Sequence, residues 1–287
     1  MIIVTGATGQ LGSLIVDSLL ARVPADQVGV SVRDPARAGD LAARGVRVRR
    51  GDFTHPASLA EAFEGATQVL VVSANATGGA AVAQHTAAID AAAAAGAERV
   101  LYTSHQAAAA DSLFEPMPDH AATEAHGQHA GVPFTALRNG FYASTVPLLL
   151  GPALQTGELV APADGPVSWT THADLAAAAA ALLAGADRSP GPTPPLTGPA
   201  ALDLADVAAL LTELTGRPVR RVVADDEEWT TGLIGHGVPA AQARMLLGMF
   251  SASRRGEFAT TGPALGELLG RPATPLRAVL EAVAAAA

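Results

Sequence analysis

The chain begins with the stretch Met1-Ile-Ile-Val-Thr-Gly-Ala-Thr-Gly-Gln-Leu-Gly12, in which a short apolar run leads directly into three glycines. The β-branched residues at 2–4 predict a buried strand. The segment after the glycines has the spacing of an amphipathic helix, with apolar residues at Leu14, Ile15, Leu19 and Leu20. A strand, a glycine-rich turn and a helix in this order are the context of a dinucleotide-binding fingerprint.

Each glycine of that turn has a mechanical role. Gly6 lets the chain turn tightly off the strand, Gly9 lets the backbone approach a pyrophosphate, and Gly12 lets the helix lie close to the sheet. The N–H groups of the first helical turn then face the anion, aided by the helix dipole. The residues expected to contact the dinucleotide here are Gly6, Thr8, Gly9, Gln10 and Leu11.

Composition narrows the class of protein. The 287 residues, 49% of them hydrophobic, can form one large domain or a domain with a smaller companion. The net charge of −9 argues against binding nucleic acid or an anionic membrane. All 18 basic residues are arginine and there is no cysteine, which excludes lysine-dependent chemistry, disulfides and thiol catalysis. The first strand leaves no room for a signal peptide, and every apolar run is interrupted well short of about 20 residues, so we expect a soluble cytoplasmic protein.

Strands and helices alternate through the first half of the chain. Apolar or alternating runs predict strands at 2–4, 28–32, 46–50, 68–72, 99–103 and 134–138. Helical segments are predicted at 35–44, 58–63, 80–95, 119–130 and 174–184. This alternation predicts an α/β fold, a Rossmann-type, doubly wound parallel sheet with a smaller, mostly helical C-terminal substrate lobe.

The second half has a different character. Residues 189–199 hold five of the chain's 20 prolines, which indicates a boundary or an extended crossing segment. We expect residues 1–150 to form the NAD(P)-binding domain, with 167–200 returning to it. Residues 201–287, with 151–166, are expected to form the substrate-binding lobe.

Several motifs converge on one family. They are Gly6–Gly12, Val32-Arg-Asp-Pro35, Gly51-Asp-Phe53, Tyr102-Thr-Ser104, Thr123-Glu124, Leu137-Arg-Asn-Gly-Phe-Tyr142 and Thr171-His-Ala-Asp174. In these motifs the chain resembles the NmrA-like group of atypical short-chain dehydrogenases and, within it, the NADPH-dependent quinone oxidoreductases. The likeness runs from Met1 to about Leu276. It implies an NAD(P)H-dependent oxidoreductase.

Cofactor choice depends on the end of the second strand. An NAD enzyme places a carboxylate there for the ribose hydroxyls, whereas this chain has Arg33, with Arg37 one helical turn further on. A guanidinium suits a 2′-phosphate, so we expect NADPH, although the neighbouring Asp34 could serve NAD. The resemblance adds further cofactor contacts at Asp52, Phe53, Ser73, Ala74, Asn75 and Thr103. For Phe53, core packing is an equally good interpretation.

Catalysis is marked by an absence. Typical short-chain dehydrogenases use a tyrosine and a lysine to protonate the product, and the matching positions here are Ala121 and Ala125. Tyr102 stands in a different context and is interpreted as structural. A quinone can be reduced without such a pair, because hydride addition yields a stabilised phenolate. The sequence therefore predicts hydride transfer to a quinone or a similar electron-poor acceptor, with proximity as the main catalytic effect.

The candidate reaction site lies beyond the fifth and sixth strands. Asn139 and His105 are the candidate catalytic residues, although Asn139 could instead complete a tight turn before Gly140. Gln106, Phe141 and Tyr142 are the candidate substrate contacts, and Trp169 is expected to serve in packing. No metal site is expected, because His120, His126 and His129 lack a partnering carboxylate pattern and are interpreted as a wet helix face.

Two other functions stay open. One is a non-catalytic, NmrA-like sensor of NAD(P) that acts through a protein partner. The other keeps the reductase chemistry but uses an imine or enone intermediate as substrate. A small-molecule acceptor is the expected partner, and a homodimer is left as an assembly to test.

Overall fold

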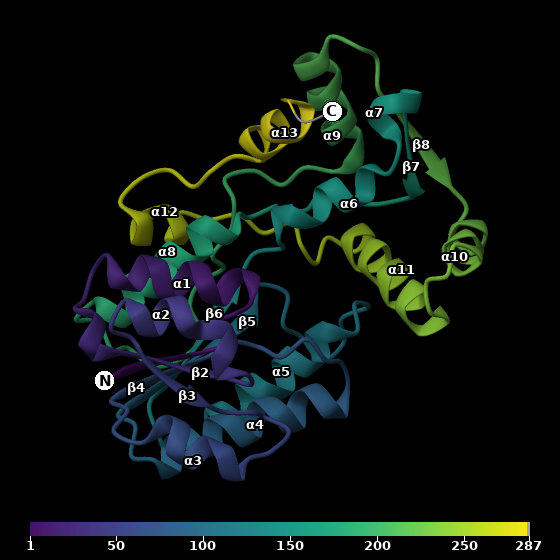
Figure 1. Ribbon diagram of the computed structural model, residues 1–287. Coiled ribbons are helices and arrows are strands. Elements are labelled where there is room, and N and C mark those ends of the chain that lie inside the picture. Colours follow the sequence, from purple (N-terminus) through teal and green to yellow (C-terminus); the bar gives the residue numbers. More distant parts are fainter. Residues whose placement is uncertain (286–287) are drawn as a thin grey trace.

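A computed structural model describes residues 1–285. Six parallel strands form the main sheet in the order β3-β2-β1-β4-β5-β6 (Figure 1). Their bounds are β1 Ile2–Thr5, β2 Val28–Val32, β3 Arg47–Arg50, β4 Gln68–Val71, β5 Arg99–His105 and β6 Phe134–Asn139. The order reverses direction between β1 and β4, which is where ligands bind in open α/β sheets. The predicted fold class is confirmed.

Helices cover both faces of this sheet (Figure 1). One face carries α1 (Gln10–Leu20) and α8 (His172–Ala184), whose apolar residues share a core with β1 and β2. The other face carries α3 (Ala57–Phe63) and α4 (Gly79–Ala94) on a second core, with α5 (Pro116–Gly127) beside α4. The short α2 (Gly39–Ala43) connects β2 to β3.

The proline-rich segment forms part of the sheet's edge. Gly191, Thr193 and Leu196 donate their N–H groups to carbonyl oxygens of β6, at 2.7, 2.9 and 2.8 Å. Residues 189–198 therefore run extended along β6 instead of linking two bodies. A proline-rich strip at a sheet edge offers few donors to another chain, which protects the edge from further pairing.

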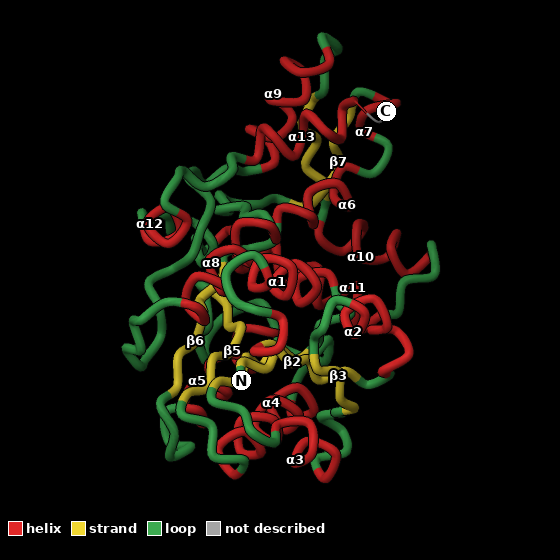
Figure 2. Tube along the Cα trace, turned by 60° about the vertical axis from the view of Figure 1, so that its left-hand side comes forward, coloured by secondary structure: helices red, strands yellow, loops and turns green. Residues whose placement is uncertain are grey.

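The remaining elements form a lobe above the carboxyl ends of the strands (Figures 1 and 2). Its helices are α6 Val146–Leu150, α7 Ala153–Thr156, α9 Leu204–Thr215, α10 Asp226–Gly235, α11 Ala240–Arg254 and α13 Leu276–Ala285. Its two parallel strands, β7 (Glu158–Pro162) and β8 (Arg220–Ala224), come from distant parts of the sequence. The apolar residues at 219–223 predict a short strand that matches β8, whereas no sequence pattern predicts β7. Helix α12 (Ala264–Leu269) packs on α8.

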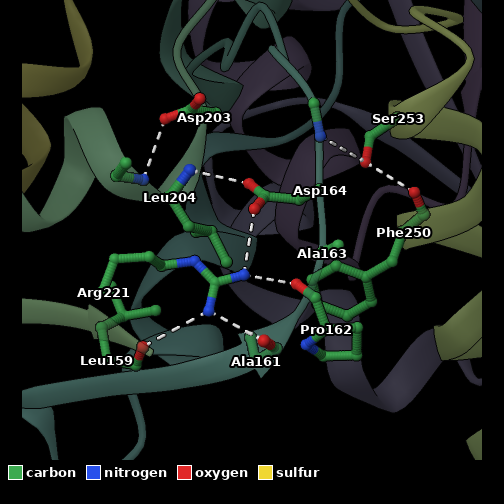
Figure 3. Close-up of polar contacts among 12 residues, drawn as sticks. Leu159, Ala161, Pro162, Ala163, Asp164, Asp203, Leu204, Arg221, Phe250 and Ser253 are labelled. Atoms are coloured by element: carbon green, nitrogen blue, oxygen red, sulfur yellow. Dashed lines mark hydrogen bonds and ion pairs between the residues drawn. The ribbon is translucent and has the colours of Figure 1, made fainter. Parts of the chain in front are cut away.

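The pair Arg221 and Asp164 holds the lobe together (Figure 3). The two charged groups are 3.0 Å apart and both side chains are largely buried, at 11% and 13% exposure. Arg221 also donates to the carbonyl oxygen of Ala161 at 2.8 Å, and Asp164 accepts the N–H of Leu204 at 2.7 Å. One ion pair thus connects β7, β8 and the start of α9.

Candidate active site

The carboxyl ends of β1, β2, β3 and β4 open into a cleft of about 930 Å³. Twelve residues proposed from the sequence line it. They are Gly6, Thr8, Gly9, Gln10, Leu11, Arg33, Asp52, Phe53, Ser73, Ala74, Asn75 and Tyr142. Five other proposed residues, Thr103, His105, Gln106, Asn139 and Phe141, do not line it.

The glycine-rich turn forms one end of the cleft floor. Gly6 has a φ of +61°, a left-handed conformation that favours glycine, and its carbonyl oxygen accepts the N–H of Gly9 at 2.9 Å. A Cβ on Gly12 would lie 2.2 Å from that same oxygen. Gly12 is thus required by the turn itself, and not only by the sheet as the sequence suggested. Helix α1 carries no acidic residue in its first turn, so its N-terminal dipole is free to attract an anion.

Two arginines lie where β2 ends. Arg33 and Arg37 are exposed, line the cleft, and make no side-chain hydrogen bond or ion pair within residues 1–285. Asp34 instead accepts the N–H of Ala36 at 3.1 Å and caps the short helical turn that follows. Its carboxylate is outside the cleft lining, which removes the main reason to expect NAD at this position.

The wall next to these arginines comes from β3. Asp52 accepts two hydrogen bonds from Thr54, at 2.9 and 2.8 Å, and these bonds are the main cause of its lowered pKa. Phe53 is half-buried on the α3–α4 core and also lines the cleft, so it packs on the core while its cofactor contact stays a prediction. The nearby Ser31 Oγ is buried without a hydrogen-bond partner among the described residues.

The three residues that follow β4 each donate their backbone N–H group to a buried side chain. Val72 donates to Thr5 Oγ1, Ser73 to Thr103 Oγ1 and Ala74 to His85 Nε2, all at 2.8 Å. These bonds fix the path of residues 72–74 along the cleft. Thr103 is 1% exposed, and it acts beneath Ser73 as a clamp instead of as the predicted direct cofactor contact.

The opposite wall comes from the far side of the sheet. The rings of Tyr142 and His172 lie 4.2 Å apart, and both line the cleft with Ser144. Burial raises the pKa of Tyr142 to about 12, despite the polar side chain of Asn139 beside it. Asn139 ends β6, is 2% exposed, and has an Oδ1 with no partner among residues 1–285.

The chain does not make a tight turn at Asn139-Gly140. Gly140 continues the extended chain and donates its N–H to the Leu196 carbonyl oxygen at 2.8 Å. A Cβ on Gly140 would lie 2.1 Å from Thr170 Oγ1, so close packing requires the glycine. Asn139 is therefore available for a role at the site, as an unpartnered acceptor.

The candidate acceptor residues lie at the junction with the lobe. His105 packs edge-on against Phe141 and Phe258, with ring centroids 5.5 and 5.7 Å apart. Gln106 has both ends of its amide engaged, since Nε2 donates to the Phe258 carbonyl and Oε1 accepts from Ser168, each at 3.0 Å. Gln106 therefore connects sheet and lobe, which leaves less of its amide for the predicted substrate contact. Trp169 is buried, as expected.

Helix α5 has no proton donor at the positions of the missing pair, Ala121 and Ala125. Tyr102 lies within β5 and not at its end, fully buried, with burial raising its pKa. Its hydroxyl lies 2.7 Å from His120 Nδ1. We expected His120 to lie on a solvent-exposed helix face, and this is wrong, because its ring is turned inward. His129 is exposed, and His126 pairs with Asp90 at 2.6 Å.

Sequence reasoning missed part of the cleft lining. Ser31, Gln84, Ser144 and His172 all line the cleft but were not proposed. Ser31 is the second-to-last residue of β2, two positions before Arg33. Its place near the carboxyl end of a strand could have marked it as a candidate. The other three are brought in by α4, by the segment after β6 and by α8, and no local pattern points to them.

The turn, the sheet order and the cleft together define a Rossmann-type protein that binds a nicotinamide dinucleotide. The model of the NmrA-like family matches residues 1–277, and the chain belongs to the NmrA-like family.

Relatives within the family point to one chemistry. The chain is 35% identical to quinone oxidoreductase 2 of Escherichia coli K12 over 277 residues, 96% of each chain. The crystal structure of the NADPH-dependent quinone oxidoreductase of Escherichia coli with NADPH has a TM-score of 0.92, at 34% identity and 99% coverage of both chains. Triphenylmethane reductase of Citrobacter sp. with NADP(H) has a TM-score of 0.90, at 33% identity, over 99% of this chain and 100% of that one. The predicted family is confirmed, and these relatives agree with the predicted NADPH-dependent oxidoreductase.

Proposed function

We propose that the protein is an NADPH-dependent oxidoreductase that transfers hydride to a quinone or a similar electron-poor acceptor, without a tyrosine–lysine pair. One observation carries the proposal. A dinucleotide cleft with two free arginines at one end lies in a chain whose relatives are named for reducing quinones and dyes with NADPH or NADP(H).

Several side chains in and beside the cleft have properties that suit NADPH. Arg33 and Arg37 offer guanidinium groups that have no partner among residues 1–285, which suits a 2′-phosphate. Beside Arg33, Ser31 also lines the cleft. Next to Tyr142 of the opposite wall, but outside the cleft lining, the buried Asn139 Oδ1 has no donor among residues 1–285.

The chemistry of the site follows from what these residues do. When NADPH is bound, its nicotinamide supplies the hydride. The glycine-rich turn and residues 72–74 line the cleft, and internal hydrogen bonds fix their positions before the dinucleotide binds. Phe141, Phe258 and Trp169 form an apolar junction that excludes water from a flat acceptor. Rate enhancement then comes mainly from holding the two reactants at reacting distance.

Stopped-flow mixing of the NADPH-loaded protein with 1,4-benzoquinone tests the proposal. We expect cofactor oxidation faster than that of free NADPH at the same quinone concentration. A non-catalytic NAD(P) sensor would instead bind the dinucleotide tightly and leave the rate unchanged over a panel of quinones. That outcome would reject the proposed reaction.

Two finer statements are also proposed. No helix within residues 1–285 is long and apolar enough to cross a membrane. We infer a cytoplasmic location, in keeping with a reductase that draws on NADPH, and fractionation of cells producing the protein tests it. A homodimer is the assembly to test, and light scattering coupled to size-exclusion chromatography gives the mass directly.

A further inference from the structure

A row of histidines leads from the cofactor cleft to the junction with the lobe. His85 on α4 contacts Ala74 of the cleft lining, His120 on α5 follows it, and His105 at the end of β5 completes the row. Neighbouring rings are stacked, with centroids 6.4 Å apart for His85 and His120 and 6.3 Å apart for His105 and His120. No group of three or more histidine, cysteine, aspartate or glutamate residues that could hold a metal ion occurs among the described residues.

A backbone amide fixes the proton on the first ring. The N–H of Ala74 donates to His85 Nε2 at 2.8 Å, so this nitrogen must be an acceptor. A neutral imidazole has only one acceptor nitrogen, and therefore His85 carries its proton on Nδ1. This agrees with burial, which lowers the pKa of His85 to about 4 and keeps the ring uncharged.

The proton on His85 Nδ1 then determines where the protons of Tyr102 and His120 lie. His85 Nδ1–H faces two hydroxyl oxygens, that of Tyr102 at 3.1 Å and that of Thr123 at 3.2 Å, and Thr123 already donates its own proton to the Asp119 carbonyl oxygen. Because Nδ1 carries a proton, the Tyr102 hydroxyl cannot donate to it. Tyr102 is left with its own proton to donate, and the available acceptor is His120 Nδ1 at 2.7 Å. The proton of neutral His120 is consequently on Nε2. Aligned donors of this kind polarise one another, which strengthens the last donor in the chain.

His105 has the same tautomer as His120, and a different hydrogen bond fixes it. The N–H of Ala107 donates to His105 Nδ1 at 3.1 Å, so the ring proton is on Nε2. Burial lowers the pKa of both His105 and His120 to about 3. Neither Nε2 has a protein partner among residues 1–285, and both side chains keep part of their surface exposed.

We propose that His105 and His120 present their Nε2–H groups to the oxygen of the hydride acceptor, with His85 and Tyr102 as positioning residues that fix the proton of His120. The inference rests on the proposed function. Hydride addition to a quinone carbonyl system leaves a negative charge on oxygen, and two neutral donors at a poorly hydrated junction stabilise that charge. The proton that completes the hydroquinone comes from water, so neither imidazole has to give up its own.

Nitrogen NMR of histidine side chains in the cofactor-free protein tests the proton positions. We expect the Nδ1–H tautomer for His85 and the Nε2–H tautomer for His105 and His120. In Tyr102→Phe the last donor to His120 is lost, so a mixture of tautomers is expected there. An Nδ1–H tautomer for His120 in the unaltered protein would overturn the inference.

Binding of 1,4-hydroquinone, followed in the same spectra, tests contact with the acceptor site. We expect the Nε2 signals of His105 and His120 to move and that of His85 to stay. A titration that leaves both Nε2 signals in place, up to saturation of the protein, would also overturn the inference. This measurement needs no altered protein.

Kinetics with 1,4-benzoquinone separate the inference from the proposed function. His120→Phe is expected to lower kcat/KM for the quinone roughly 10-fold or more, with NADPH binding unchanged. His120→Gln, which keeps an amide donor, should recover part of the loss. His126→Phe, on the outer side of the same helix, serves as the control. If the unaltered protein reduces no quinone, the proposed function fails. If it does and His120→Phe is equally active, only the role of His120 fails.

Discussion

At the Arg33 end of the cleft, the chain contributes residues that directly follow strands, whereas in the histidine row beside the cleft each side chain comes from a different element. Gly6, Arg33 and Asp52 follow β1, β2 and β3 within one or two residues. His85 and His120 come from α4 and α5, and meet only because both helices pack on one face of the sheet. The first region is built from local geometry and the second from tertiary packing, so substitutions should affect them differently.

The largest effect is expected in the lobe that covers the acceptor end. Asp164→Ala leaves Arg221 buried without its carboxylate, and should lower the free energy of unfolding by about 3 kcal/mol. Urea unfolding measures it. Glu158→Ala, which removes an exposed partner of Arg220 on the same ribbon, is the control and should cost less than about 1 kcal/mol. Similar losses in both variants would contradict the importance of the buried pair.

Next comes the glycine-rich turn, which belongs to the cofactor end. Gly12→Ala would place a Cβ 2.2 Å from the Gly6 carbonyl oxygen, so the turn must open. We expect a loss of about 2 kcal/mol in the free energy of unfolding. Fluorescence titration should also show NADPH affinity lower by about tenfold or more. Gly39→Ala, where nothing lies within 4 Å of the added Cβ, is the matched control. Normal NADPH affinity in Gly12→Ala would refute this account of the turn.

A smaller and more selective effect is expected at Arg33. Hydrogen bonds to charged groups contribute about 1.5–3 kcal/mol, so Arg33→Ala should weaken NADPH binding roughly 10- to 100-fold. NADH binding should hardly change, because NADH has no 2′-phosphate. Titrations with both cofactors check the difference, and Arg22→Ala, at an exposed position outside the cleft lining, is the control. Equal losses for both cofactors would show that Arg33 does not recognise the phosphate.

The histidine row predicts a dependence of stability on pH. Burial holds the pKa values of His85, His105 and His120 at about 4, 3 and 3, whereas in the unfolded chain histidine titrates near pH 6.5. Between these values the unfolded state binds more protons, so stability is complete above about pH 6.5 and decreases as the pH falls.

Each buried histidine should lower the free energy of unfolding by about 1.4 kcal/mol per pH unit in this window. Urea unfolding at about pH 6 and about pH 5, where most carboxylates are still ionised, measures the slope. His120→Asn should reduce that slope by the contribution of one histidine. Parallel slopes in the two proteins would show that His120 is not held neutral by folding.

The same division between the two regions explains what could be predicted. A glycine pattern after an apolar run specifies a turn by steric rules that need no distant partner. The role of Arg33 could be predicted because Arg33 directly follows the second predicted strand. The roles of three other residues, Thr103, Gln106 and His120, were predicted less accurately from the sequence. Whether a threonine is a ligand or a clamp depends on Ser73, and whether a glutamine is free depends on Ser168 and Phe258, all of which are distant in sequence.

The sequence by itself determined the parallel sheet, the dinucleotide turn, the arginines at the end of β2 and the missing tyrosine–lysine pair, because each depends on residue type at short spacing. Only the tertiary structure decided that β7 pairs with β8, that the proline-rich segment edges the sheet, and that the backbone N–H of Ala74 donates to His85. Hydrogen-bond direction depends on which groups meet in space, and packing alone brings these groups together.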